Sequence, residues 1–159
     1  MLNLVHENDY CKLYHGDSTE YTGDADWVIT NPYANLPKQL QSKPMLICDF
    51  DNRHKLAEER CGTKLELVSH WYNGINSIWV GNHDLIKVDL TDLNPEMPEG
   101  WFPEELVWRL LRDYKVRGVV WDGFMGRGTV GKASKYVRRF IGIDKDIKRV
   151  EYAKFYIFS

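Results

Sequence analysis

A chain of 159 residues with 43% hydrophobic and 28% charged residues has the composition of a globular protein with a buried core. It has no run of about 20 apolar residues and no basic stretch before an apolar segment at its start, so we expect neither membrane association nor a signal peptide. Three cysteines without a Cys-x-x-Cys pair, and no metal-ligand spacing among the histidines, predict a reducing, cytoplasmic setting and no metal site.

Charge is distributed unevenly along the chain. The net charge is −2 and the sequence pI about 6.2, so any affinity for nucleic acid has to come from a local surface. Residues 127–149 contain eight Lys and Arg against two Asp, whereas residues 84–105 contain seven Asp and Glu against one Lys. The basic stretch is typical either of a solvated helix face or of a phosphate-binding surface.

Apolar periodicity and turn residues predict an alternation of strands and helices. Strands are expected, in chain order, at residues 11–15, 26–30, 45–50, 65–72, 75–80, 83–90, 118–122 and 140–144. Helices are expected from a cap at 51–52 to about 60, over 104–114 behind Pro103, from the glycine turn to about 138, and from about 147 toward 155, with a loop at 94–103.

The order of these elements predicts an α/β fold. Strand, glycine turn, helix and strand follow one another from 118 to 144, which is a parallel crossover, whereas Asn73-Gly74 is a two-residue hairpin signal. We therefore expect one domain over residues 1–159. Its sheet should be mixed but mostly parallel, with an antiparallel hairpin at about Leu65 to Leu90 and helices on both faces.

The glycine turn is the strongest chemical signal in the sequence. Gly126–Gly131 matches G-x-G-x-x-G between a strand and a helix, and Asp144 lies 18 residues after Gly126 at the end of the next strand. Glycines let the backbone approach a ligand closely, and a carboxylate at a strand end can accept hydrogen bonds from ribose hydroxyls. The pattern suits a nucleoside cofactor but does not separate a dinucleotide from S-adenosylmethionine.

Neighbouring residues narrow the choice of ligand. Lys132 follows Gly131 as in a phosphate loop, but Ala133 stands where the hydroxyl that holds Mg²⁺ is needed. Asp122 at the strand tip would repel a pyrophosphate, and it would attract the cationic methionine end of S-adenosylmethionine. A turn that serves only helix–strand packing is the remaining alternative.

Two segments near opposite ends of the chain resemble one family. Asp122–Thr129 resembles the Asp-Pro-Phe-x-Gly-x-Gly-Thr cofactor loop of amino-group DNA methyltransferases, and Asn31-Pro32-Tyr33 resembles their catalytic (Asp/Asn/Ser)-Pro-Pro-(Tyr/Phe/Trp) turn. The catalytic turn precedes the cofactor loop, as in the beta group of that family. Weaker similarities follow the same order from about residue 11 to 150, at Gly16–Ser18, His83-Asp84, the Pro103 helix and Gly142–Asp144.

The resemblance implies a Rossmann-like methyltransferase domain with permuted order, S-adenosylmethionine as cofactor and DNA as partner. It implies that the turn residues Asn31, Pro32 and Tyr33 are catalytic, and that Tyr33 stacks on a base flipped from the helix. The cofactor would be bound by Asp17 at the adenine, Phe124 packed against it, Asp144 at the ribose, Asp122 near the methionine end, and Gly126, Gly128 and Thr129 of the loop. Phosphate contacts are expected from Arg127, Lys132, Arg138 and Arg139.

The chain also departs from the family pattern. The turn has one proline where the family has two, and Gly123 replaces the proline of the cofactor loop. Only the short acidic stretch 89–102 stands where a target-recognition segment is expected, which leaves room for a homodimer or a separate recognition subunit.

Several activities remain open at this point. Methylation of adenine N6 is favoured, because asparagine rather than serine opens the turn. Cytosine N4, RNA and protein glutamine are the alternative targets. A catalytically weak cofactor-binding protein that acts with a partner, and a nicotinamide-dependent oxidoreductase, are the other two hypotheses.

Overall fold

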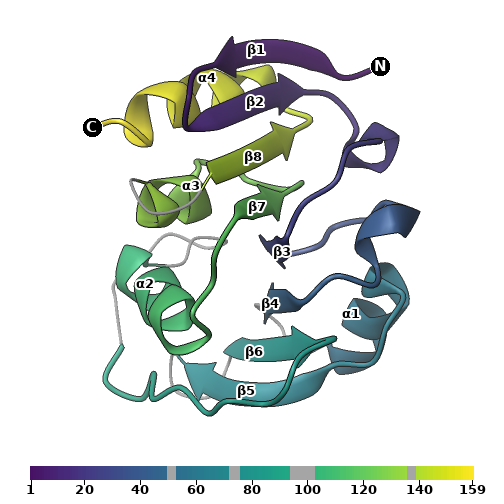
Figure 1. The fold of residues 1–159 in the computed structure, drawn as a ribbon, viewed down its shortest axis with the longest axis vertical. Helices are drawn as coiled ribbons and strands as arrows, with labels where there is room; N and C mark the ends of the chain where they lie inside the picture. The colour runs from purple at the N-terminus through teal and green to yellow at the C-terminus, as the bar shows by residue number, and fades with distance from the viewer. Residues whose placement is uncertain (50–52, 72–75, 94–102, 136–138) are drawn as a thin grey trace.

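The computed structural model describes residues 1–49, 53–71, 76–93, 103–135 and 139–159. In these ranges eight strands form one sheet in the order β1-β2-β8-β7-β3-β4-β6-β5, which Figure 1 shows from β1 at one end to β5 at the other. The strands are β1 (Asn3–Glu7), β2 (Cys11–His15), β3 (Trp27–Thr30), β4 (Met45–Asp49), β5 (Glu66–Trp71), β6 (Asn76–Gly81), β7 (Val119–Asp122) and β8 (Arg139–Asp144).

Five adjacent strands, β2, β8, β7, β3 and β4, run parallel to one another. β1 pairs antiparallel with β2 at one edge, and the β5–β6 hairpin adds antiparallel to β4 at the other. Because the five central strands point the same way, their carboxyl ends meet at one rim of the sheet. That rim is where α/β proteins bind their ligands.

Helices cover both faces of the sheet and bury two separate apolar cores. The helices are α1 (His54–Cys61), α2 (Glu104–Asp113), α3 (Thr129–Ser134) and α4 (Ile147–Tyr156), with short 3-10 turns at Ser18–Glu20 and Lys38–Leu40. Side chains of α2, α3 and α4 share one core, whereas α1 packs into the other, and Figure 1 shows α1 and α2 on opposite sides. Among the described residues, no helix has the length and apolar character needed to cross a membrane.

The expected fold class is confirmed: a mixed sheet with an antiparallel hairpin and helices on both faces. β2 has the predicted bounds, and β3, β7, β8, α2 and α4 agree with their predicted ranges to within one or two residues. Pro103 precedes α2 as its N-cap residue. The expected hairpin turn at 73–74, the helix cap at 51–52 and most of the loop at 94–103 lie outside the described residues.

One predicted strand is wrong, and one predicted helix is shorter than expected. Residues 83–90 form no strand, although Val88 and Leu90 are buried in alternation. At Ile86 a side chain takes the place of a neighbouring strand: the Tyr114 hydroxyl accepts a hydrogen bond from Ile86 N and donates one to Ile86 O. The helix after the glycine turn ends at Ser134 rather than near 138, since Lys135 already has an extended conformation. In addition, β1 was not expected from the sequence.

Candidate active site

The expected catalytic turn leaves the buried strand β3 at the carboxyl rim. Asn31 is 6% exposed and Pro32 is buried, whereas the Tyr33 side chain is 57% exposed. Asn31 Nδ2 donates to Tyr33 Oη at 3.3 Å. Since the nitrogen of the carboxamide is engaged in this way, its oxygen remains as a hydrogen-bond acceptor beside an exposed aromatic ring.

The expected cofactor loop leaves β7 at the same rim and is fixed by hydrogen bonds to the end of β8. Gly126 N donates to Asp144 Oδ2 at 2.9 Å, and Met125 N donates to Ile143 O at 3.0 Å. Gly126 has φ +54° and Gly128 φ +91°, the left-handed conformation that glycine adopts most readily. The second oxygen of Asp144 accepts from Asp146 N at 2.9 Å, so this carboxylate organises the ends of two loops.

The turn and the loop lie side by side, although about 90 residues separate them in the sequence. The Tyr33 and Phe124 rings meet edge to face with centroids 6.2 Å apart. Below them, Thr30 Oγ1 donates to Asp122 Oδ1 at 2.6 Å, which joins the ends of β3 and β7. The strand order therefore brings together the two segments that the sequence singled out.

Asp122 is a buried carboxyl at the centre of this rim, with 2% of its surface exposed. Burial raises its pKa to about 7, against the hydrogen bonds from Thr30 Oγ1 and Phe124 N, which favour the ionised form. A carboxyl of this kind changes charge near neutral pH, and a nearby cation would favour its ionised state.

Asp17 lies at the same rim, after β2, and caps the short 3-10 turn at Ser18–Glu20. Its Oδ1 accepts from Thr19 N at 2.9 Å and from Thr19 Oγ1 at 2.8 Å. These bonds lower the pKa of Asp17, and Lys145 at the end of β8 lies 3.8 Å from its second oxygen. Beside it, the buried Ser18 Oγ has no hydrogen-bond partner among the described residues.

Residues 9–155 match the family of N6/N4 DNA methylases. The chain belongs to that family. Comparison with curated protein sequences gives no match.

Solved structures share the fold of this methylase at low sequence identity. M1.HpyAVI, solved with S-adenosylmethionine, superposes with a TM-score of 0.65 at 20% identity over 92% of this chain and 99% of its own. TTHA0409 from Thermus thermophilus, assigned as a DNA modification methylase and solved with S-adenosyl-L-methionine, gives 0.66 at 18% identity over 91% and 92%. The cytosine-N4-specific PvuII DNA methyltransferase gives 0.65 at 14% identity over 92% and 86%.

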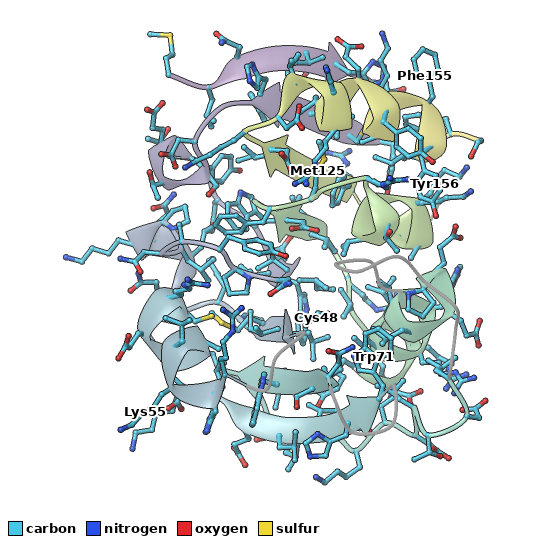
Figure 2. The ribbon with its side chains drawn as sticks, turned by 180° about the vertical axis from the view of Figure 1, so that it is seen from behind. Cys48, Lys55, Trp71, Met125, Phe155 and Tyr156 are labelled. Atoms are coloured by element: carbon cyan, nitrogen blue, oxygen red, sulfur yellow. The ribbon has the colours of Figure 1, made fainter. Side chains whose placement is uncertain are left out.

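The described basic residues expected at DNA are spread over the cofactor loop, α3 and the start of β8. Arg127, within the cofactor loop, is exposed, with its guanidinium 5.2 Å from the Tyr152 ring centroid. Lys132 lies 4.4 Å from the ring centroid of Tyr156, the α4 residue labelled in Figure 2, and 3.5 Å from a Glu104 oxygen. Arg139 begins β8, at the strand end away from Asp144. Arg138 lies outside the described residues.

Gly123, the glycine that replaces a proline in the cofactor loop, has a local explanation. A Cβ placed on it would lie 2.1 Å from Cη2 of Trp121, whose side chain is fully buried. Any residue with a Cβ, proline included, would collide with this indole. The departure from the family pattern is therefore paired with the large side chain two residues earlier.

One residue of the site carries no signal in the sequence. Arg60, in the last turn of α1, donates from a guanidinium nitrogen to Pro32 O at 2.8 Å. It lines a small surface pocket beside the turn together with Asn31, Pro32, Arg53, Leu56 and Ala57. It lies 28 residues after Pro32 and belongs to no motif, so the sequence offered no means to find it.

Proposed function

We propose that this methylase transfers a methyl group from S-adenosylmethionine to an exocyclic amino group of a base in DNA, with adenine N6 as the favoured target. The observation that carries the proposal is the contact between the Tyr33 and Phe124 rings, which sets the turn against the cofactor loop. Membership of the N6/N4 family and the cofactor-bound relatives support it.

The residues at the rim fit this cofactor. A Cβ at Gly126 would meet no atom within 4 Å, so the loop backbone opens onto free space where a nucleoside could approach. Asp144 would hold the ribose hydroxyls, since each carboxylate oxygen keeps acceptor capacity beyond its present bond. Asp122 would face the methionine end, Phe124 would pack on the adenine and Asp17 would contact it. When bound, S-adenosylmethionine supplies an electrophilic methyl group.

The turn would act on the acceptor amine. The lone pair of an exocyclic amine is delocalised into the base ring, which makes it a poor nucleophile. Acceptance of its two N–H groups by Asn31 Oδ1 and Pro32 O would favour a tetrahedral nitrogen and free the lone pair. Tyr33 would hold the extruded base by stacking, so that the site works mainly by positioning.

The choice of adenine rests on Asn31 alone. Because the relatives include a cytosine-N4-specific enzyme, cytosine N4 is the competing target within the same chemistry. RNA and protein glutamine stay as competing substrates because the same turn type can serve them.

Sequencing of methylated bases in DNA from cells that express the protein tests the proposal directly. We expect N6-methyladenine with the natural chain and none with Asn31→Ala. Methyl incorporation into DNA, RNA and protein in parallel compares the substrate classes. Cofactor binding without transfer to any of them would instead support a binding protein that acts through a partner.

A further inference from the structure

Arg60 contacts the segment after β3 at two points. Its guanidinium donates to Pro32 O at 2.8 Å, and its own backbone oxygen accepts from Leu36 N, also at 2.8 Å. Further along, Gln41 Nε2 donates to Leu36 O at 3.1 Å. The end of α1 therefore holds both ends of residues 32–36.

The local chain leaves the Pro32 carbonyl more than one allowed orientation. The pyrrolidine ring fixes φ of Pro32, but ψ, which turns the carbonyl, can take helical or extended values, and a proline at the next position would disfavour the helical ones. Here the next residue is Tyr33. A hydrogen bond to the carbonyl oxygen limits the same rotation from outside the turn.

Arg60 suits this task because of its position. It is half-buried against the turn and lies in the last turn of α1, where the helix dipole favours a positive charge. A guanidinium offers several donors in a fixed plane. The contact is therefore directional.

We propose that Arg60 is a positioning residue that sets ψ of Pro32, and so aims the Pro32 carbonyl at the amine of the target base. This inference rests on the proposed function of the turn. A carbonyl oxygen has two lone pairs, so the bond from Arg60 leaves one for the base. Arg60 does the work that a second proline would do in this turn.

Steady-state kinetics of methyl transfer can distinguish a positioning role of Arg60 from electrostatic attraction of DNA. In Arg60→Ala we expect kcat to fall about tenfold to hundredfold, because small misplacements of reacting groups have effects of this size. The KM values for cofactor and DNA should stay within about twofold. Arg60→Gln, which keeps a neutral donor, should recover part of kcat.

Lys55→Ala is the matched control, since it removes a positive charge from the same helix at an exposed site that points away from the protein in Figure 2. It should leave kcat unchanged. A higher KM for DNA with unchanged kcat in Arg60→Ala would make Arg60 a phosphate contact and overturn the proposal. An unchanged or higher kcat with unchanged KM would overturn it as well.

A second measurement needs no activity. The Asn31 carboxamide bonds to Tyr33 across the turn, so its side-chain NH2 resonances report the turn geometry. They should shift and broaden in Arg60→Ala and stay in place in Lys55→Ala; unchanged resonances in Arg60→Ala would refute the positioning role. If the natural chain transfers no methyl group, the proposed function fails while these spectra still decide on Arg60.

Discussion

The cofactor loop and the catalytic turn meet at one rim but are held in different ways. The loop is fixed by backbone N–H groups that bond to residues at the end of β8, the strand next to its own. The turn is instead held from α1, where the Arg60 side chain bonds to Pro32 O and the Arg60 backbone oxygen accepts from Leu36 N. In the chain, α1 is separated from the turn by the 3-10 turn at Lys38–Leu40 and by β4. A loop held by the strand next to its own can be predicted from the sequence motif. A turn held by a separate helix can be predicted only in part.

The two regions also tolerate their departures from the family pattern in different ways. The missing proline of the loop is explained by Trp121, which lies two residues earlier on β7, the strand that leads into the loop. The missing proline of the turn is matched by an arginine 28 residues away. If this comparison is right, substitutions in the loop should change cofactor affinity or stability, and substitutions in the turn should change transfer alone.

Asp144→Ala should have the largest effect, confined to the loop. The change removes the ribose acceptor and leaves Gly126 N without the carboxylate that holds it. Hydrogen bonds to charged groups contribute about 1.5–3 kcal/mol each, so we expect cofactor affinity to fall about 100-fold or more in calorimetry.

The neighbouring acid provides the control for this experiment. Asp146 caps α4 by accepting from Lys148 N, so Asp146→Ala should lower stability by about 1 kcal/mol and leave cofactor affinity unchanged. Unchanged affinity in Asp144→Ala would remove Asp144 from the cofactor site.

Tyr33→Ala should show the converse behaviour. Stacking of a base on an aromatic ring contributes about 1–3 kcal/mol, so transfer to DNA should fall about tenfold to hundredfold while cofactor affinity stays within about twofold. A labelled-methyl assay and calorimetry on the same preparations measure the two quantities. Tyr33→Phe keeps the ring and loses only the hydroxyl that Asn31 contacts; a loss equal to that of Tyr33→Ala would argue against stacking.

Elements with a strong local pattern were predictable from the sequence. β3, β7 and β8 are short apolar runs that end in a turn residue or an acid, and α2 has a clear apolar stripe. β1 was not predicted because it is an edge strand whose residues are all exposed or half-buried. Its sequence therefore lacks the alternation of apolar and polar residues that marks a strand with one buried face. Residues 83–90 show the opposite error. Their apolar residues alternate as in a strand, but the segment packs on the core without pairing to any described strand, and its Ile86 backbone bonds to the Tyr114 hydroxyl.

The residues of the candidate site could be predicted only where they belong to a sequence motif. Asn31, Tyr33, Phe124 and Asp144 belong to motifs, and their common rim follows from parallel strand ends. Which strands are neighbours was not readable, because β3 and β7 come from opposite halves of the chain. The Thr30–Asp122 bond depends on that neighbourhood, and the Arg60–Pro32 contact depends on where α1 packs against the turn, so neither could be read from the sequence.

Gly123→Ala tests whether the Trp121 side chain is the reason that the cofactor loop has glycine instead of proline at this position. The added Cβ would overlap the buried Trp121 ring, and overpacking of this kind destabilises by about 1–3 kcal/mol. Urea unfolding should show this loss in the natural background. In a Trp121→Leu background the added methyl group should lower stability much less, and an equal loss in both backgrounds would mean that the indole is not the reason for the glycine.

Asp122 belongs to both regions, because it ends the strand that carries the loop and accepts the Thr30 hydroxyl of the strand that carries the turn. Burial raises its pKa to about 7, so between about pH 4 and pH 7 the folded protein keeps a proton that the unfolded chain has released. This group therefore lowers the free energy of unfolding as pH rises through that range. The stability of Asp122→Asn relative to that of the natural chain should therefore rise between about pH 4 and pH 7 and level off above that range.

Cofactor binding should respond to pH in the opposite direction. A cationic methionine end prefers the ionised carboxyl, and for a group with a pKa of about 7 the ionised fraction rises about tenfold between pH 6 and pH 8. Cofactor affinity should rise by the same factor, and binding near pH 7 should release about half a proton per molecule, seen by calorimetry in buffers of different ionisation enthalpy. Asp122→Asn should abolish both effects. If the pH dependence persists in Asp122→Asn, another group carries it, and Asp122 then joins the two strands without sensing the ligand.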